Sequence, residues 1–354
     1  MAVPPNGDRQ TQKGKLMCLR DSHRLLLAAC LLTTACSGQT STAEPEPTVP
    51  PTTAPIFTTT TSAMTSTTLA PTTTTTTAPA VISTRGLIYA IGSRGNTPVE
   101  WKADLHEPTE AGNWPALVFL PGQGQGTNSV YNVAEEIAAR GVVVLVIDYA
   151  DRSPTAMPND DARGYREVAG LLGCGIRFAR QRVEDAGGEP KLLAVGGMSV
   201  GGGSAAHAAL AGESLDQLWE EFSASRNLPR LLECVVEEGS THVDALVGVS
   251  GAYDVFVGYE GLYYGLEYLQ ERDMQLWELL HGALELNANL QVRLLHGRAD
   301  TIIEYENSEG FVTALTSVGI DVELTEFEGG HSLPHDETVA AVLDILGVSG
   351  PAGS

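Results

Sequence analysis

The chain has 354 residues, enough for one large domain or two small ones, and its 43% hydrophobic and 18% charged residues are typical of globular proteins. Residues 81–354 contain 16 Lys and Arg against 40 Asp and Glu, so this part carries a net charge of −24. An acidic surface repels phosphate groups, which argues against nucleic acid or an anionic surface as a partner.

The first 36 residues have the pattern of a bacterial export signal. Arg20 and Arg24 precede the apolar run Leu25–Leu32, which is shorter than the roughly 20 residues of a bilayer-spanning helix and typical of a signal peptide core. Small residues then lead into Cys36, as in a lipobox, so we expect Cys36 to be lipidated and to become the new N-terminus. An ordinary secretory signal with cleavage nearby is the alternative, and Met17 is an alternative start.

Residues 37–80 contain little except Thr, Ser, Pro and Ala, so they cannot bury enough apolar surface to offset the entropy of ordering the backbone. We interpret them as an extended, solvated tether. Signal and tether together predict an extracellular domain, either anchored at the cell surface or secreted, whose only membrane contact is a lipid anchor.

From Val81 onward, apolar β-branched runs alternate with helical patterns. Near-continuous apolar runs, as in strands buried on both faces, predict strands at 116–120, 142–147, 191–195, 245–249, 290–295 and 321–327. Helical patterns lie at 129–140, 162–185, 200–211, 304–317 and 337–346. This alternation predicts a mostly parallel sheet with helices on both faces, and runs at 87–91 and 99–105 predict an antiparallel pair at its start.

Two segments are longer than a crossover needs, at about 213–243 and 253–287. Both follow strands at the sheet edge where open α/β folds bind ligands, so we interpret them as a helical cap or as walls of a substrate pocket. The second is rich in aromatic residues, of which Tyr253 and Tyr263 are candidates for contacting substrate. The alternative is that most of these rings pack the insertion onto the body of the domain.

Two cysteines, Cys174 and Cys234, remain in the domain once the signal has been removed and Cys36 has been lipidated. In an exported protein such a pair can form one disulfide, and two buried thiols are an equal alternative. The sequence does not decide between them, because it does not place the two residues within bonding distance.

A serine lies in the turn between a predicted strand and a helix of small residues. The sequence G-M-S-V-G centred on Ser199 directly follows the strand 191–195. A strained bend presents a serine hydroxyl to a base, and Gly197 and Gly201 avoid collisions of Cβ atoms with the neighbouring strand and helix. The Val200 N–H, at the helix N-terminus, is a candidate donor to developing negative charge. Ser199 is therefore the predicted nucleophile.

A glycine-rich loop, P-G-Q-G-Q-G at 121–126, follows the strand 116–120. Its glycines let backbone amides approach a ligand. We therefore expect the loop to supply a second oxyanion donor, the Gln123 N–H, with Gly122 and Gly124 lining the substrate site. A flexible turn without a catalytic role is the alternative.

Two further strands end in loops that carry an acid and a base. Asp300 lies in the loop after the strand 290–295, where its carboxylate can orient a histidine. Glu304 and Glu306 are weaker candidates for the acid, because they fit the first turn of the next helix. His331 lies in a glycine-rich loop after the last strand, and it alone of the eight histidines has this position, so it is the predicted base.

The other histidines do not predict further chemistry. His207 lies inside the helix after Ser199 and is expected to be a core or surface residue, and His296 is expected to have a structural role. His331 and His335 lie near Asp336, but no additional ligand has suitable spacing, so we predict no metal site and no cofactor.

The order Ser199, Asp300, His331 and the surrounding motifs resemble bacterial α/β-hydrolase esterases related to dienelactone hydrolase, to acetyl-xylan and feruloyl esterases, and to the prolyl-oligopeptidase catalytic domain. The resemblance covers most of the chain from Val81 and rests on GMSVGGGSA, VGVSGAYD, HGRADTIIEYENSEGF and FEGGHSLP. It implies the α/β-hydrolase fold, with Ser199 as nucleophile, Asp300 as acid and His331 as base. Residues 121–124 replace the His-Gly-Gly-Gly loop frequent in such enzymes, which leaves the second oxyanion donor open.

These residues predict a serine hydrolase, and most simply a monomeric carboxylesterase that acts on a small-molecule or polymer ester. A polyester- or cutin-degrading enzyme is one alternative, from a loose similarity at 160–164, against which stands the long stretch between Ser199 and Asp300. A prolyl-oligopeptidase-like peptidase is another, although such enzymes usually carry an N-terminal propeller. A catalytically silent surface binding protein is the third, because a fold does not by itself imply a function.

Overall fold

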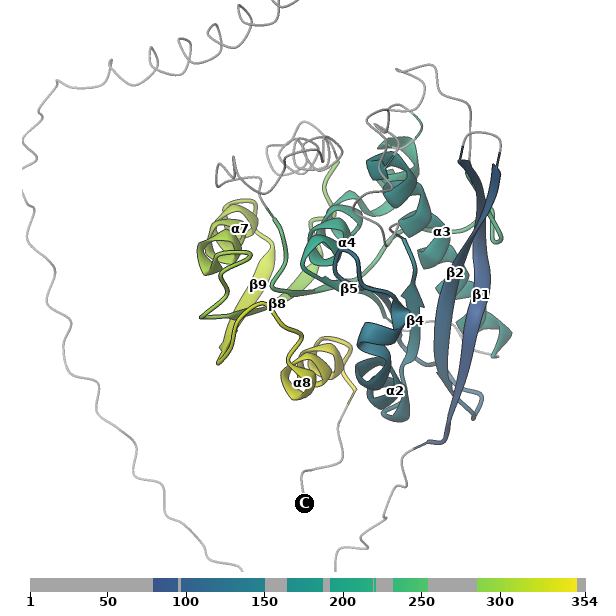
Figure 1. The fold of residues 1–354 in the computed structure, drawn as a ribbon, viewed down its shortest axis with the longest axis horizontal. Helices are drawn as coiled ribbons and strands as arrows, with labels where there is room; N and C mark the ends of the chain where they lie inside the picture. The colour runs from purple at the N-terminus through teal and green to yellow at the C-terminus, as the bar shows by residue number, and fades with distance from the viewer. Residues whose placement is uncertain are drawn as a thin grey trace, which may run out of the picture. The chain divides into compact units, whose positions relative to one another are not determined.

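The computed structural model describes residues 79–94, 97–149, 164–186, 192–218, 220, 232–253 and 285–348 (Figure 1). The predicted signal, Cys36, nearly all of the tether and Tyr263 lie outside the described residues, as does most of the second predicted insertion. Within the described ranges, no helix is both long and apolar enough to cross a bilayer.

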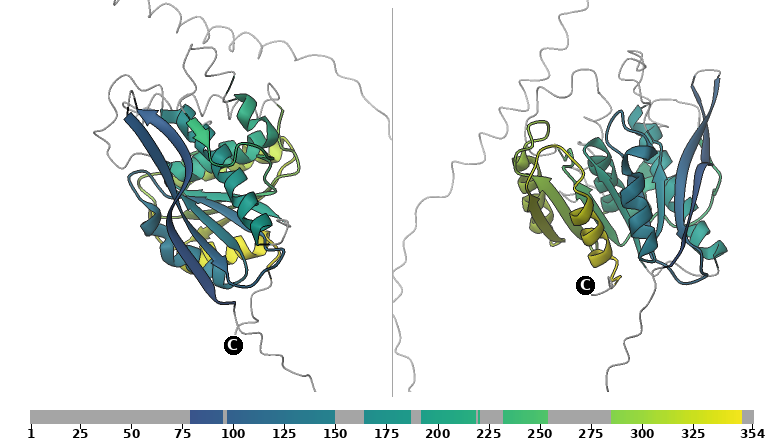
Figure 2. Two further views of the ribbon diagram at one scale, coloured as in Figure 1. Left: turned by 90° about the vertical axis from the view of Figure 1, so that its right-hand side faces the viewer. Right: turned by 60° about the horizontal axis from the view of Figure 1, so that its bottom comes forward.

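One nine-stranded sheet forms the centre of the described part of the chain, in the order β6-β1-β2-β4-β3-β5-β7-β8-β9. From β4 to β9 in this order all neighbouring strands are parallel, whereas β1 pairs antiparallel with β2 and β6, and β2 pairs antiparallel with β4. The strands are β1 Val81–Arg94, β2 Thr97–Pro108, β3 Ala116–Leu120, β4 Val143–Ile147, β5 Leu193–Met198, β6 Leu232–Cys234, β7 Ala245–Val249, β8 Gln291–Gly297 and β9 Asp321–Phe327. Long β1 and β2 stand at one side of the sheet (Figure 2).

Helices cover both faces of the sheet (Figure 1). Buried side chains of α2 and α8 share a core with one face, and those of α3, α4 and α7 share a second core with the other. The helices of the described ranges include η1 Thr127–Val130, α2 Tyr131–Ala139, α3 Gly164–Asp185, α4 Val200–Ala211, η2 Gly212–Ser214, α7 Tyr305–Ser317 and α8 His335–Ile345.

Strand β3 shows why the central strands are continuous apolar runs in the sequence. All five of its residues are buried. Leu117 and Phe119 belong to the core under α2 and α8, while Val118 and Leu120 belong to the core on the opposite face. The predicted mostly parallel sheet, the helices on its two faces and the antiparallel pair at its start are confirmed.

The described part of the first insertion has a different position from the one predicted. Strand β6, within 213–243, pairs with β1, with Cys234 opposite Ala90, at the edge of the sheet farthest from β9. Residues 232–234 therefore extend the sheet as an edge strand and do not themselves form a cap or a wall of a pocket. Only Leu232 in this three-residue strand is buried, so the sequence carries little signal for it.

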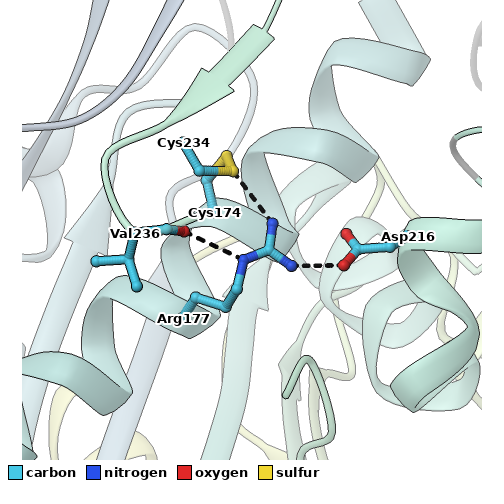
Figure 3. The surroundings of a disulfide bond; sticks show 5 residues. All are labelled: Cys174, Arg177, Asp216, Cys234 and Val236. Carbon is cyan, nitrogen blue, oxygen red and sulfur yellow. Dashed lines mark hydrogen bonds and ion pairs between the residues drawn. A yellow bond between two sulfur atoms is a disulfide. The ribbon is translucent and has the colours of Figure 1, made fainter. Parts of the chain in front are cut away.

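A disulfide joins this edge strand to the helix beneath it (Figure 3). Cys174 in α3 and Cys234 in β6 are bonded, with Cα atoms 5.0 Å apart, which decides between the two predicted alternatives. The buried guanidinium of Arg177 packs beside the bond. It donates to Cys234 Sγ at 3.1 Å, to Asp216 Oδ2 at 2.5 Å and to Val236 O at 3.3 Å. The disulfide and this cation together hold β6 against α3.

Replacing both cysteines with alanine is expected to lower the free energy of unfolding by about 2–5 kcal/mol, because the bond links residues 60 positions apart in the unfolded chain. Urea unfolding of the wild type and of C174A/C234A, each with and without a thiol reductant, measures the effect. Reductant should move the wild-type midpoint toward that of the variant and leave the variant unchanged. Equal midpoints in all four experiments would contradict a stabilising role for the disulfide.

Candidate active site

Ser199 lies in a sharp bend between β5 and α4, with φ of 58° and ψ of −126°. A non-glycine residue in this region carries strain of about 1–3 kcal/mol. The bend is possible because the residues two positions before and after Ser199 are glycines, which have no side chain. A Cβ at Gly197 would lie 2.6 Å from the backbone of Gly201, and a Cβ at Gly201 would lie 2.5 Å from the carbonyl oxygens of Leu120 and Pro121. The predicted need for glycine at both positions is confirmed.

Hydrogen bonds from the neighbouring strand β7 and the turn after it hold this bend. The Ser199 N–H donates to Val249 O at 3.0 Å, and the Ser199 carbonyl accepts from the Ala252 N–H at 2.9 Å. Ser250, between these two partners, is fully buried and also has a positive φ, of 43°. Two strained bends therefore lie beside each other at the ends of β5 and β7.

The loop predicted to supply an oxyanion donor forms a tight turn beside Ser199. The Gln125 N–H donates to Gly122 O at 3.0 Å, and Gly124, at the third position of this turn, has φ of +71°. A Cβ built on Gly122 would lie 3.5 Å from Ser199 Cβ, whereas Gln123 and Gly124 are exposed. The Gln125 side chain also accepts from the Gly122 N–H at 3.3 Å, an interaction that no sequence pattern indicated.

Asp300 and His331 form a hydrogen-bonded pair. His331 Nδ1 lies 2.7 Å from Asp300 Oδ2, and Asp300 Oδ1 accepts from the amides of Ile302 and Ile303 at 2.9 and 3.0 Å. Burial opposes ionisation of the carboxyl, but the hydrogen bonds from His331 and the two amides outweigh it and hold the pKa of Asp300 below its usual value. Because the carboxylate can only accept, Nδ1 of His331 carries a proton, and Nε2 of the neutral ring is an acceptor.

The sheet brings the loops of this pair together. Asp300 follows the end of β8 by three residues and His331 follows the end of β9 by four. The Ala299 N–H donates to Gly329 O at 2.8 Å, so the two loops are in backbone contact. Strand β7 separates β8 from β5, and in the described structure no hydrogen bond joins the Ser199 hydroxyl to the His331 ring. Catalytic hydrogen bonds of this kind often tighten only when substrate binds.

Tyr253 has a different environment from the one predicted. Its side chain is 1% exposed, and its ring stacks on Phe311 of α7 with centroids 4.3 Å apart. Its N–H donates to Asn307 Oδ1 at 2.8 Å. This packing places Tyr253 in the core and contradicts its assignment to the wall of a substrate pocket. Tyr263, the other aromatic candidate, lies outside the described residues.

The rival candidates for acid and base have other roles. Glu304 is the N-cap residue of α7 and Glu306 lies in its first turn, where negative charge suits the helix dipole. His207 is buried within α4, and His335 pairs with Glu136 of α2 at 2.8 Å. In the described ranges, no group of three or more His, Cys, Asp or Glu side chains could hold a metal ion.

Two more histidines, His106 in β2 and His296 in β8, are fully buried. Nδ1 of His106 lies 2.9 Å from Ser83 Oγ, and Nδ1 of His296 lies 2.7 Å from Ser308 Oγ. Burial lowers the pKa of both rings, because the charged form loses its hydration.

Solved structures with a similar arrangement define the class of fold. The chain has the α/β-hydrolase fold. Esterase 2 of Thermogutta terrifontis, phosphoramylated by tabun, matches with a TM-score of 0.53 and 21% identity, over 76% of this chain and 96% of that chain. The butyrate-bound structure of the same thermophilic esterase matches with a TM-score of 0.53 and 22% identity, over 78% of this chain and 97% of that chain.

A similarity to a curated protein is also present in the sequence. The chain is 31% identical over 144 residues to Esterase LipC of Mycobacterium tuberculosis (strain ATCC 25618 / H37Rv). This match covers 40% of the chain and 30% of the length of that relative. No known family profile matches the chain.

Stability is expected to fall as the pH decreases below about 6.5, the pKa of a histidine in the unfolded chain. His106 and His296 have lowered pKa values in the folded state, so between the two values the unfolded chain binds more protons than the folded chain. Thermal unfolding of the wild type, H106L and H296L, measured from about pH 8 to about pH 5, checks this. Each variant should lose less stability on acidification than the wild type does, and three parallel curves would contradict the expectation.

Proposed function

We propose that residues 81–354 form an extracytoplasmic serine hydrolase that cleaves carboxylic esters. The observation that carries this proposal is the 2.7 Å hydrogen bond between His331 and the buried carboxylate of Asp300. These two residues and the strained Ser199 all follow the carboxyl ends of parallel strands, at the same edge of the sheet. An imidazole oriented by an anionic carboxylate is the base that a serine nucleophile requires.

In the proposed reaction, Nε2 of His331 accepts the hydroxyl proton of Ser199 while its oxygen attacks the ester carbonyl carbon. Asp300 keeps the ring in the tautomer whose Nε2 can accept, and it stabilises the imidazolium that forms. The imidazolium then protonates the departing alkoxide, so an alcohol leaves and an acyl-enzyme remains. Water, giving its proton to His331, attacks the acyl carbonyl. The carboxylic acid departs, and Ser199 regains its proton.

The negative charge on the carbonyl oxygen needs donors near Ser199. We assign this role to the backbone amides of Val200 and Gln123. Val200 begins α4, whose N-terminus carries a partial positive charge, and Gln123 lies in the turn whose first residue, Gly122, adjoins Ser199. Gly122 and Gly124 would then line the path along which the acyl group enters.

The similar proteins support an ester as substrate. LipC is named an esterase, although the chain spans only about 30% of its length, and the Thermogutta enzyme is an esterase solved with butyrate and with propionate. We therefore propose short-chain acyl esters as substrates. Rates on p-nitrophenyl butyrate, a polyester film and a peptide anilide would separate this function from a polymer hydrolase and from a peptidase.

We also propose that the domain works outside the cell on a lipid anchor at Cys36. The signal-like segment, the tether composition and the disulfide support this location, because disulfides persist in oxidising compartments. The domain is expected to be a monomer that requires no cofactor.

Substituting Cys36 with alanine is expected to remove the anchor and leave the domain intact. The wild type should fractionate with membranes of the expressing bacterium and enter a detergent phase, whereas C36A should not. C30A, which changes a cysteine inside the predicted apolar core, is the matched control and should behave like the wild type. A wild type that remains soluble after export would favour the cleaved secretory signal, and retention inside the cell would contradict export.

Replacing Ser199 with alanine is expected to lower kcat for p-nitrophenyl butyrate by about 10,000-fold or more, because the nucleophile is lost. Ser250→Ala is the matched control, since Ser250 is also a buried serine at positive φ on the adjacent strand end. It should retain activity.

Equal activity of S199A and the wild type would remove Ser199 from its proposed role. A fluorophosphonate probe reports independently on the same claim, and it should label the wild type and S250A but not S199A. A wild type that neither hydrolyses esters nor reacts with the probe would favour a catalytically silent binding protein.

A further inference from the structure

His296 is a buried histidine that the proposed reaction does not use. It lies in β8, four residues before Asp300, and none of its surface is exposed. Its ring has a partner at each nitrogen. Nδ1 lies 2.7 Å from Ser308 Oγ, and Nε2 lies 2.9 Å from Ile303 O and 3.4 Å from Asp300 Oδ2. The ring therefore bridges α7 and the loop that carries the acid.

These contacts define the tautomer of the ring. A carbonyl oxygen can only accept a hydrogen bond, so Nε2 of His296 must carry the proton that it shares between Ile303 O and Asp300 Oδ2. Nδ1 of the neutral ring then accepts from the Ser308 hydroxyl. Burial, which lowers the pKa of His296, favours this neutral form.

The carboxylate of Asp300 consequently meets donors on both oxygens. Oδ1 accepts the amides of Ile302 and Ile303, while Oδ2 faces His331 Nδ1 at 2.7 Å and His296 Nε2 at 3.4 Å. Ile303 is held twice, because its N–H donates to Asp300 and its carbonyl accepts from His296. The His296 ring thus fixes both the carboxylate and the segment that donates to it.

We propose that His296 is a positioning residue for Asp300, and through Asp300 for the base His331. This inference rests on the proposed function, since it assigns a role within the same triad. It goes beyond a packing role because one N–H of the ring faces the oxygen that orients His331, and so shares the negative charge on which the base depends.

Among the described residues, the other charged groups near the ring lie at the start of α7 and on its neighbours. Tyr305, at the start of α7, meets it edge to face with centroids 5.6 Å apart, and the Tyr305 hydroxyl donates to Glu326 of β9 at 3.0 Å. Arg298 lies over the Tyr305 ring and pairs with Glu326. Of the titratable side chains in the described ranges, Asp300 contacts the His296 ring, and Asp300 and His331 influence it electrostatically.

Removing the N–H of the His296 ring should change the pH dependence of the reaction in a defined direction. Without it, Asp300 carries a less dispersed negative charge and attracts the His331 proton more strongly. His331 then stays protonated, and unable to act as a base, up to a higher pH. The acid limb of the kcat/KM profile should therefore move to higher pH, and kcat on its plateau should fall about tenfold or more as Asp300 loses its fixed orientation.

The experiment compares H296L, which has no donor, with H296Q, whose amide NH₂ can replace Nε2–H, and with H106L, which removes an equally buried histidine from β2. Each variant is assayed on p-nitrophenyl butyrate across pH, and its unfolding is measured. H296L should show the lower kcat, a KM near that of the wild type and the shifted limb. H296Q should recover most of the wild-type kcat and most of the wild-type position of the acid limb. H106L should lose stability without a shift of that limb.

An unshifted acid limb in H296L, or a loss of kcat that H106L reproduces, would overturn the proposal. If H296L does not fold, H296F decides, because it keeps a planar ring in the same buried space but has no N–H to donate. A limb shifted in the same direction supports positioning, and an unchanged limb contradicts it. A wild type with no hydrolysis and no fluorophosphonate labelling would overturn the proposed function itself. An active wild type with a normal H296L would overturn this inference alone.

Discussion

The strained backbone of Ser199 is the constraint on which the rest of the site depends. A positive φ at a residue with a side chain is unfavourable, so it persists only where the surroundings leave no alternative. Here Gly197 and Gly201 allow strand, helix and loop backbones to approach closely, and hydrogen bonds to Val249 and from Ala252 hold the bend from the next strand. The serine is thereby presented at the end of a buried strand, beside the turn at Gly122.

Asp300 and His331, the proposed acid and base, are held in place in a different way. Parallel strands β8 and β9 end at the same edge, and their loops touch through backbone hydrogen bonds, so Asp300 and His331 meet although they lie 31 positions apart in the sequence. Burial alone would neutralise the carboxyl. Several donors on its two oxygens reverse that tendency, which is why a buried carboxylate can stay charged and orient an imidazole. In this part of the site, charge and geometry are set by the same hydrogen bonds.

The sequence predicted those features that depend on local patterns. Buried strands appear as apolar runs, and the elbow at Ser199 appears as glycines at fixed spacing between a strand and a helix. Other features depend on contacts between distant segments. The disulfide and strand β6 arise because residue 234 reaches α3 and β1, which spacing does not reveal. The prediction that Tyr253 contacts substrate is wrong, because an aromatic side chain next to a strand end can point into the core as well as into a pocket. The contact of His296 Nε2 with Asp300 Oδ2 cannot be predicted from the sequence, because it depends on how the loop that carries Asp300 folds back on β8.

The proposed mechanism requires that the hydroxyl of Ser199 and the imidazole of His331 act on one another. A crystal structure of the protein after reaction with an organophosphorus ester tests this most directly. We expect a covalent adduct on Ser199 Oγ, with Nε2 of His331 about 3 Å from that oxygen and Nδ1 still hydrogen-bonded to Asp300. An adduct on another residue, or a His331 ring that remains out of reach of the modified serine, would contradict it.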